Sequence, residues 1–312
     1  MALALVTGGA GFIGSHLVHA LVAQGFAVRV LDNLSTGREH NLDGIDVHLI
    51  IGDIRQRESV AEAMQGVSVV YHQAAMISVP ESITNPHLCY EVNVHGSLNI
   101  LWAAHKARVR KVVLASSCAV YGEATSPGLE TDNLTPLSPY AASKLAVEDM
   151  ASLFSATYAV PTVCLRYFNV YGPGQDANSA YAAAIPQFIT ALLSGKQPTI
   201  FGDGSQTRDF VYVGDVVRAN LLAGQDDKIA NGTFNIAGSG GISILDMVEN
   251  LREILPDAPQ PKFGPARKGD ILHSSADKRL ALEALGYRPE IALEQGLQLT
   301  VQWFQSRTEA AT

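Results

Sequence analysis

The first apolar run of the chain, Ala2–Val6, leads directly into three glycines spaced three residues apart, in TGGAGFIG over residues 7–14. Gly8 allows a sharp turn, and Gly11 leaves room for a pyrophosphate against the backbone. Gly14 lets the helix that follows pack closely on a sheet. The unpaired N–H groups at the start of that helix would then face phosphate oxygens. A strand, a glycine turn and a helix in this order predict a dinucleotide site.

The acidic residues after the next two strands refine this prediction. The spacing is G-x-x-G-x-x-G rather than the standard G-x-G-x-x-G, so the sequence context matters. Asp32 ends the expected strand Val28–Leu31, where a carboxylate can accept from both ribose hydroxyls and would repel a 2′-phosphate. NAD is therefore favoured over NADP, although Asp32 could also simply start a turn with Asn33. Asp53 either reaches the adenine amino group or caps a helix that begins near Arg57.

The first half of the chain alternates continuous apolar runs with amphipathic stretches. Buried strands separated by helices are typical of a parallel sheet that is covered on both faces. We therefore expect an α/β fold with a doubly wound parallel Rossmann sheet. The other expected strands are Val47–Ile51, Val67–His72, Lys111–Ser116 and Thr162–Arg166, and the expected helices are Phe12–Gln24, Arg57–Met64, Val92–Ala107 and Pro139–Tyr158.

The pattern changes after Phe168, where the loops become longer and richer in glycine and proline. We expect residues 1–168 to form the NAD-binding domain, with later segments returning to it. Residues 169–312 are expected to form mainly a smaller α/β substrate-binding lobe. Its expected helices are Ala182–Leu193, Val216–Leu222, Ile244–Leu255 and Ala292–Phe304.

Composition excludes several classes of protein. Of the 312 residues, 47% are hydrophobic and 17% charged, which rules out wholesale disorder. The net charge of −8 argues against a nucleic-acid binder, and no apolar run is long enough to span a membrane. The N-terminal MALALVTGG meets glycine too early for a signal peptide. The three cysteines, Cys89, Cys118 and Cys164, are too few and too scattered for a disulfide framework, which indicates a reducing, cytoplasmic setting. Neither the cysteines nor the histidines have the spacing of metal ligands, so we expect no metal.

A tyrosine and a lysine four residues apart predict acid–base chemistry. In SPYAASK, Pro139 suits a helix start, and the spacing places Tyr140 and Lys144 on one helix face. A neighbouring ammonium would lower the pKa of the phenol, so that Tyr140 could take and return a hydroxyl proton. Ser117 follows the expected strand Lys111–Ser116, at the edge of the sheet where ligands bind. A surface helix pair and a serine that only satisfies a strand end are the alternatives.

Taken together, these segments resemble the extended short-chain dehydrogenase/reductase family, and within it nucleotide-sugar epimerases of the UDP-glucose 4-epimerase type. The resemblance covers nearly the whole chain. The matching segments are TGGAGFIGSHL, LDNLSTG, GDI, HQAA, NVHGSLNIL, SSCAVYG, SPYAASK, RYFNVYGPGQ, GDGSQTRDFVYVGD and RKGD.

The resemblance implies a tightly held NAD and an epimerisation at C4 of a UDP-hexose. Tyr140 would remove the C4 hydroxyl proton while hydride moves to NAD, and hydride would return to the other face of the transient 4-keto sugar. Ser117 would flank the same hydroxyl, and Lys144 would hold the nicotinamide ribose. The implied cofactor contacts are Gly8, Gly11, Phe12, Ile13, Gly14, Asp32, Asn33, Asp53, Ile54, Ala74, Asn93, Tyr140, Lys144 and Tyr167.

The resemblance also implies a binding site for the UDP moiety in the second lobe. The guanidinium groups of Arg208 and Arg267 would bind the diphosphate, because each has two parallel N–H donors that suit paired phosphate oxygens. Ser274, four residues after the RKGD segment, stands where a large aromatic residue limits the sugar pocket in some relatives. A serine there would leave room for the N-acetyl group of UDP-GlcNAc and UDP-GalNAc. The implied substrate contacts are Ser117, Asn169, Phe201, Arg208, Arg267, Asp270 and Ser274.

Two further positions bear on the reaction. Related dehydratases and decarboxylases carry an acidic residue two positions before the tyrosine of SSCAVYG, where this chain has Ala119. Ala182–Ala184 stands where several relatives carry an asparagine near the sugar. Relatives pair through the helices that correspond to Val92–Ala107 and Pro139–Tyr158, so a homodimer is expected. The alternatives are a dehydratase or reductase acting on a nucleotide sugar, and a non-catalytic dinucleotide sensor.

Overall fold

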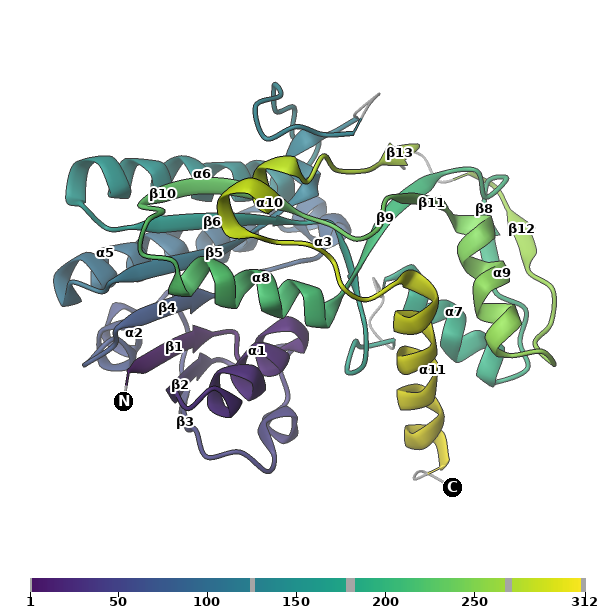
Figure 1. Ribbon diagram of the computed structural model, residues 1–312, viewed down its shortest axis with the longest axis horizontal. Helices are drawn as coiled ribbons and strands as arrows, with labels where there is room; N and C mark the ends of the chain where they lie inside the picture. The colour runs from purple at the N-terminus through teal and green to yellow at the C-terminus, as the bar shows by residue number, and fades with distance from the viewer. Residues whose placement is uncertain (1, 124–126, 178–182, 267–270, 310–312) are drawn as a thin grey trace.

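A computed structural model describes residues 2–123, 127–177, 183–266 and 271–309 (Figure 1). Within these residues, the largest sheet has 7 parallel strands in the order β10-β6-β5-β4-β1-β2-β3. Its strands are β1 (Leu3–Thr7), β2 (Ala27–Asp32), β3 (His48–Ile51), β4 (Val69–His72), β5 (Lys111–Ser117), β6 (Thr162–Tyr167) and β10 (Asn231–Ile236).

Alternate residues of each strand point into two separate cores. On β1, Ala4 and Val6 pack in one core while Leu5 packs in the other. One core lies under α1 (Phe12–Ala23), α8 (Val213–Gln225) and α10 (Arg279–Leu285). The opposite core lies under α2 (Arg57–Ala63), α5 (Ser97–Ala107) and α6 (Pro139–Tyr158). Burial of both faces explains the continuous apolar strands, and the predicted doubly wound α/β fold is confirmed.

The structure differs from the expected elements at several places, and the helix expected at Val216–Leu222 in the second lobe is part of α8 on the large sheet. Strand β10 was not expected, because its sequence NGTFNI contains asparagine, glycine and threonine between its apolar residues. The expected helix Val92–Ala107 is preceded and partly replaced by a π-helical segment, Glu91–Gly96. Two short helices, α3 (Val79–Thr84) and α4 (Pro86–Tyr90), have a proline in their first turn and lie where no helix was expected.

A second lobe with its own core lies to the right of the large sheet in Figure 1. Strands β7, β11 and β13 pair with β9, and β12 pairs with β8. The lobe consists of β7 (Asn169–Tyr171), α7 (Ala184–Leu193), β8 (Thr199–Phe201), β9 (Thr207–Tyr212), β11 (Gly241–Ser243), α9 (Ile244–Ile254), β12 (Lys262–Gly264), β13 (His273–Ser274) and α11 (Leu293–Glu309).

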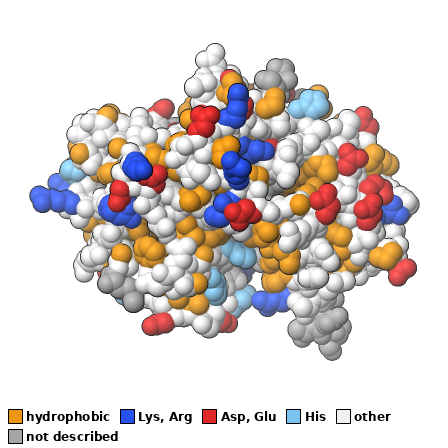
Figure 2. Space-filling view, in the orientation of Figure 1, with side chains coloured by type: hydrophobic (Ala, Val, Ile, Leu, Met, Phe, Trp, Pro, Cys, Tyr) orange, Lys and Arg blue, Asp and Glu red, His pale blue; other side chains and the backbone are white. Residues whose placement is uncertain are grey.

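The surface shows charges of both signs. On the face drawn in Figure 2, acidic and basic side chains are interspersed between polar and apolar ones. None of the helices in the described ranges is both long enough and apolar enough to cross a membrane. Among the same residues, no three His, Cys, Asp or Glu side chains gather as metal ligands would.

The end of β4 is tied to its neighbours by a buried histidine. His72 is 4% exposed; its Nδ1 lies 2.7 Å from Thr7 Oγ1 and its Nε2 lies 2.9 Å from Ser97 Oγ. The Ser97 hydroxyl donates to the Asn93 carbonyl, so it accepts from Nε2–H, and Nδ1 accepts from Thr7. The ring is therefore fully satisfied when neutral. Burial lowers the pKa of His72 to about 3.

This histidine predicts a loss of stability in acid. Below pH 6.5 the unfolded chain binds a proton at His72 that the folded protein excludes, so stability falls as the pH falls from 6.5 towards 3. The contribution is at most about 1.4 kcal/mol per pH unit. His72→Gln should flatten the dependence of unfolding free energy on pH in urea titrations between pH 7 and 5. His19→Gln, on an exposed residue, should leave the slope unchanged. An unchanged slope in His72→Gln would contradict this assignment.

Candidate active site

The glycine turn lies between the carboxyl ends of β1 and β4. A Cβ on Gly14 would lie 2.0 Å from the Gly8 carbonyl oxygen, and Gly8 has a positive φ of +68° beside the backbone of Ala74. Gly11 starts α1 without a side-chain cap, so the N–H groups of Phe12 and Ile13 remain for a ligand. A backbone this closely packed, with unpaired N–H groups at a helix start, fits a dinucleotide pyrophosphate.

Asp32 is buried at the end of β2 and supports the glycine turn. One carboxylate oxygen accepts from the Ala10 N–H at 2.9 Å, and the other accepts from the Leu34 N–H at 2.8 Å. The second bond is the turn that we considered as the alternative role of Asp32. The first bond places the carboxylate beside the glycine turn, where the predicted ribose contact requires it.

Asp53 does not cap α2, because that helix starts after Gln56 without a side-chain cap. Instead Arg55 donates to both oxygens of Asp53, at 3.0 and 2.8 Å, and Asn33 donates to one of them at 3.0 Å. The Arg55 hydrogen bonds, more than any other contact, lower the pKa of Asp53 to about 2. Arg55 was missed in the sequence, because a charged side chain after a strand usually lies in solvent.

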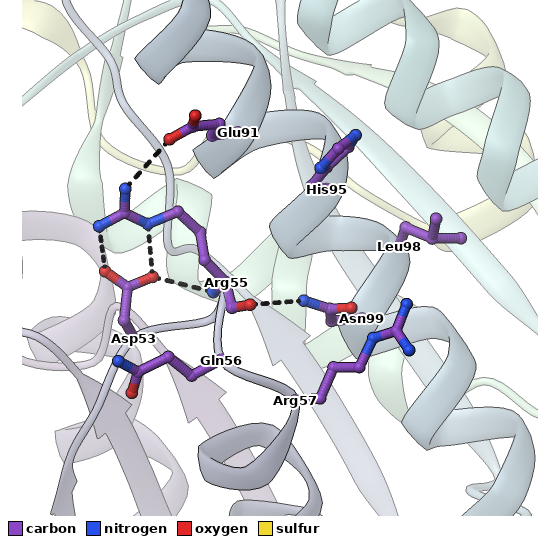
Figure 3. Close-up of a pocket in the computed structure, with 8 residues that line it drawn as sticks. All are labelled: Asp53, Arg55, Gln56, Arg57, Glu91, His95, Leu98 and Asn99. Carbon is purple, nitrogen blue, oxygen red and sulfur yellow. Dashed lines mark hydrogen bonds and ion pairs between the residues drawn. The ribbon is translucent and has the colours of Figure 1, made fainter.

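Figure 3 shows the cavity of about 560 Å³ beside this carboxylate. Arg55 spans it between Asp53 and Glu91, and the Asn99 amide donates to the Ile54 carbonyl at 3.0 Å. Ile54 itself is buried. The predicted adenosine contacts Asn33, Asp53 and Ile54 thus converge at this edge of the sheet.

The other predicted cofactor residues are buried near the ends of β4 and β6. Asn93 lies in the π-helical segment, accepts from the Met76 N–H at 2.8 Å and donates to Ser143 Oγ at 2.9 Å. Tyr167 ends β6, and its hydroxyl is hydrogen-bonded to Gln73 and Asn220. Both side chains have protein partners, so they define the shape of the site.

Ser117, Tyr140 and Lys144 meet at the carboxyl end of β5. Ser138 caps α6 by accepting from the Ala141 N–H at 3.1 Å, which fixes the first turn that carries Tyr140. The Tyr140 hydroxyl lies close enough to the Ser117 side chain for the serine to lower the pKa of the phenol. Lys144 Nζ donates to the Ala115 carbonyl on β5 at 2.9 Å. The structure therefore brings the three residues together as the helix spacing indicated.

The electrostatics of this group differ from the prediction. We expected Lys144 to lower the pKa of Tyr140, but burial raises the pKa of Tyr140 to about 12, against the smaller effect of the nearby Ser117 side chain. Lys144 Nζ lies 5.9 Å from the centre of the Tyr140 ring. Burial also lowers the pKa of Lys144 to about 8. Desolvation is the largest effect on the Tyr140 pKa, so without further positive charge the phenol stays protonated at neutral pH.

A second cavity, of about 400 Å³, lies in the second lobe. Three predicted substrate contacts line it: Asn169 on β7, Phe201 on β8 and Arg208 on β9. Ala183 and Ala184 also line this cavity and present no side-chain amide to it. Arg267, Asp270 and Ala182 lie outside the described residues.

Ser274 links this lobe to the end of β5. It lies opposite Arg208 in the pairing of β13 with β9. The Cys118 side chain, next to Ser117, lies near both Ser274 and Ser117, and both serines lower the pKa of its thiol against the effect of burial. Ser274 therefore lies beside the Ser117–Tyr140 pair, on the side of the second lobe.

Comparisons with known proteins agree with this geometry. Residues 4–237 match the sequence profile of the NAD dependent epimerase/dehydratase family. The chain belongs to this family. It is 38% identical to a UDP-glucose 4-epimerase of Mycolicibacterium smegmatis, over 98% of this chain and 99% of that protein. A UDP-N-acetyl-α-D-glucosaminuronate decarboxylase of Bacillus cytotoxicus is 34% identical, over 96% and 97% of the two chains.

Two solved structures of the family are similar throughout. The UDP-N-acetylglucosamine 4-epimerase of Methanobrevibacter ruminantium is 39% identical, with a TM-score of 0.94 over 98% of this chain and 99% of that one. The UDP-glucose 4-epimerase of Thermus thermophilus, solved with NAD, is 39% identical, with a TM-score of 0.89 over 97% and 99%. The cofactor of this family member is NAD, as the glycine turn and Asp32 predicted.

The glycine packing predicts which substitution abolishes cofactor binding. Gly14→Ala forces a methyl group against the Gly8 carbonyl and must displace the turn. NAD affinity should fall on the order of 100-fold, measured by fluorescence titration. Gly25→Ala, just beyond the other end of α1, meets no atom within 4 Å but adopts a φ of +82°. It should cost roughly 1–2 kcal/mol of stability and keep NAD affinity. Equal NAD affinity in the two variants would contradict the assignment.

Proposed function

We propose that this family member is an NAD-dependent nucleotide-sugar 4-epimerase that interconverts UDP-glucose and UDP-galactose. The observation that carries the proposal is the adjacent pair Ser117–Tyr140 with Lys144 beside it, at the end of a strand that also borders the cofactor site. The UDP-glucose 4-epimerases that match almost the whole chain support the same assignment.

In the proposed mechanism, Tyr140 and Ser117 bind the sugar's C4 hydroxyl. Bound NAD supplies a reversible acceptor for the hydride of C4. Tyr140 takes the proton of the C4 hydroxyl as the C4–H bond breaks. It later returns this proton to the C4 oxygen as the carbonyl is reduced to a hydroxyl. Ser117 holds the C4 oxygen while it is a carbonyl, and Lys144 orients the nicotinamide ribose and adds positive charge near the phenol. The 4-keto sugar turns over before hydride returns, so the net redox change is zero.

The pKa values explain why Tyr140 needs its neighbours. In the protein alone the pKa of Tyr140 is raised to about 12, so the phenolate is scarce at neutral pH. The Lys144 ammonium and the positive charge of the oxidised nicotinamide both favour the phenolate. The base would therefore form mainly in the complex with oxidised cofactor.

The nucleotide half of the substrate is assigned to the cavity in the second lobe. We propose that Arg208 binds the diphosphate, that Phe201 packs near the base and that Asn169 contacts the substrate from β7. By resemblance, Arg267 and Asp270 complete this part of the site. In this proposal the diphosphate would lie between a nucleoside in the second lobe and a hexose at Ser117.

A dehydratase fits this site less well. The decarboxylase from Bacillus cytotoxicus shows that another reaction occurs among similar proteins. Elimination of water needs an acid–base group beside the sugar. Ala119 offers none at the position where related dehydratases and decarboxylases carry a carboxylate.

The N-acetylated sugars are proposed as further substrates. Ser274 is small and lies beside Cys118, also a small side chain, next to Ser117. The similar structure from Methanobrevibacter ruminantium is a UDP-N-acetylglucosamine 4-epimerase. Space at Ser274 would admit the N-acetyl group of UDP-GlcNAc and UDP-GalNAc.

We also propose a homodimer that pairs through α5 and α6. Large apolar side chains are exposed along these helices, with Leu98 and Trp102 on α5 and Leu153 and Tyr158 on α6. Trp102 and Tyr158 stack edge to face at 5.9 Å, so the two apolar stripes adjoin. A second copy would bury them as the interface of the relatives does.

The first prediction concerns turnover. Purified protein without added cofactor should interconvert UDP-glucose and UDP-galactose in an NMR assay. Tyr140→Phe removes the proton acceptor and should slow turnover about 100- to 10,000-fold while keeping bound NAD. Tyr158→Phe, on the surface of the same helix, should match wild type. A Tyr140→Phe rate within a few-fold of wild type would exclude Tyr140 as the base.

The second prediction concerns sugar size. Ser274→Tyr fills the space assigned to the N-acetyl group, so kcat/KM for UDP-GlcNAc should fall on the order of 100-fold. The value for UDP-glucose should change less than about fivefold, and Ser274→Ala should affect neither sugar by more than a few-fold. Equal losses for both sugars in Ser274→Tyr would mean that this residue does not select the sugar.

The third prediction concerns the dimer. Leu98→Glu places a charge in the proposed interface and should convert a dimer into a monomer in sedimentation experiments. Leu299→Glu, on α11, changes a leucine of nearly the same exposure, 38% against 39%, and should leave the dimer intact. A dimer that survives Leu98→Glu would place the interface elsewhere.

A further inference from the structure

A row of buried polar side chains runs beneath the site without taking part in the proposed chemistry. Its members are Glu148 on α6, Arg166 on β6, Tyr121 after β5, and Asn235 on β10, all of them at most 7% exposed. Arg166 donates to both oxygens of Glu148, at 2.9 and 2.7 Å, and to the Tyr121 hydroxyl at 2.8 Å. The Tyr121 hydroxyl donates to Asn235 Oδ1 at 2.7 Å.

The donor and acceptor atoms of these four side chains determine the direction of each hydrogen bond in the row. Arg166 has no acceptor, so the Tyr121 oxygen must accept from it and give its own proton to Asn235 Oδ1. The Asn235 amide nitrogen then has both of its protons free, and it donates to the Gly128 carbonyl at 2.9 Å and to the Asp277 carbonyl at 3.1 Å. Each amide atom of Asn235 therefore has a buried partner, and loss of one partner leaves another unsatisfied.

The far end of the row holds the segment that carries Ser274. Residues 272–277, which we call the substrate strap, pair with β9 through His273 and Ser274. The Leu272 carbonyl also accepts from the Thr207 N–H at 2.8 Å, and the Ala276 N–H donates to the Asp209 carboxylate at 3.4 Å. Beyond Ser274 the strap runs beside Gly128, whose N–H donates to the Ser275 carbonyl at 2.9 Å. The Asp277 N–H donates back to the Gly128 carbonyl at 3.0 Å. Asn235 binds both Gly128 and Asp277 and so clamps the strap to the large sheet.

We propose that Tyr121 and Asn235 are positioning residues that hold the substrate strap, and with it Ser274, at a fixed distance from the Ser117–Tyr140 pair. This rests on the proposed function, because it takes Ser274 to face the sugar. Neither Tyr121 nor Asn235 contacts the reacting atoms; both act through the backbone of Gly128 and Asp277.

The near end of the row is tied to the same pair. Glu148 lies one turn beyond Lys144 on α6, and Ser116, next to Ser117, donates to its carboxylate at 2.5 Å. Arg166 thus has the helix of Tyr140 and the strand of Ser117 on one side, and the strap on the other. The row of buried polar side chains therefore connects both sides of the proposed sugar site: α6 and β5 on one side, and the substrate strap on the other.

Tyr121→Phe tests the proposal with little change in packing. It removes the bridging hydroxyl and keeps the ring, which packs on Phe168 with ring centres 6.2 Å apart. The KM for UDP-glucose should rise about tenfold, the equivalent of one buried hydrogen bond, with kcat and bound NAD within about twofold of wild type. Amide hydrogen exchange across residues 272–279 should become faster.

Tyr287→Phe is the matched control. Tyr287 is also buried, 1% exposed against 6% for Tyr121, and its hydroxyl donates to the Ala237 carbonyl at 2.8 Å outside the row. It should lose similar thermal stability but keep wild-type KM and exchange in the strap. If both variants change KM and strap exchange alike, the effect is general destabilisation and the proposal fails.

Asn235→Asp tests the other side of the clamp and replaces Tyr121→Phe if that variant does not fold. It keeps an acceptor for Tyr121 and removes the donors to Gly128 and Asp277, so it should reproduce the rise in KM and in exchange. The Tyr121→Phe/Asn235→Asp double variant should be no worse than the more affected single variant, since both break one chain. Additive effects on KM would overturn the proposal.

Exchange in the strap also separates this inference from the proposed activity, because it needs no turnover. A wild-type protein inactive on UDP-sugars would contradict the epimerase assignment. Unchanged strap exchange in both Tyr121→Phe and Asn235→Asp would contradict the clamp.

Discussion

The geometry of the site depends on a lysine that the fold keeps inside. Lys144 is 5% exposed, and its ammonium donates to the Ala115 carbonyl, so α6 is anchored directly to β5. Desolvation of this cation lowers its pKa to about 8, because burial beside the phenol disfavours the charged form of the lysine. Because Tyr140 and Ser117 lie on the two elements that this bond joins, their contact follows from it.

Much of the large sheet could be predicted from its apolar runs, because strands buried on both faces carry few polar residues. Leu3–Thr7 and Val69–His72 lie close to their expected limits. Asn231–Ile236 could not be found in this way. Its buried Asn235 is tolerated only because Tyr121, Gly128 and Asp277 satisfy its amide, and those partners are distant in sequence. A local pattern cannot indicate a polar core residue whose partners come from elsewhere.

In the candidate site too, some features follow from the local sequence and others depend on the whole fold. The glycine turn and the Tyr140–Lys144 spacing are local, and the structure places them as the sequence predicted. The Arg55–Asp53 pair was missed, although the two residues are only two positions apart, since exposed neighbours of opposite charge are common and weakly bound. The sign of the shift in the Tyr140 pKa was wrong for a different reason. Helix spacing shows that Lys144 is near, but the competing effect is burial, which depends on the whole fold.

The chemistry that distinguishes members of this family rests on small side chains rather than on the frame. Similar folds serve a UDP-glucose 4-epimerase and a decarboxylase of an N-acetylated sugar acid, so the fold alone does not select the reaction. In the proposed site Ala119 would present no carboxylate to the sugar, and Ser274 would present little volume. Small residues select only if the walls around them cannot shift by the width of a methyl group. A clamp through Tyr121 and Asn235 would supply that rigidity, since it ties the strap bearing Ser274 to the same sheet that bears Ser117.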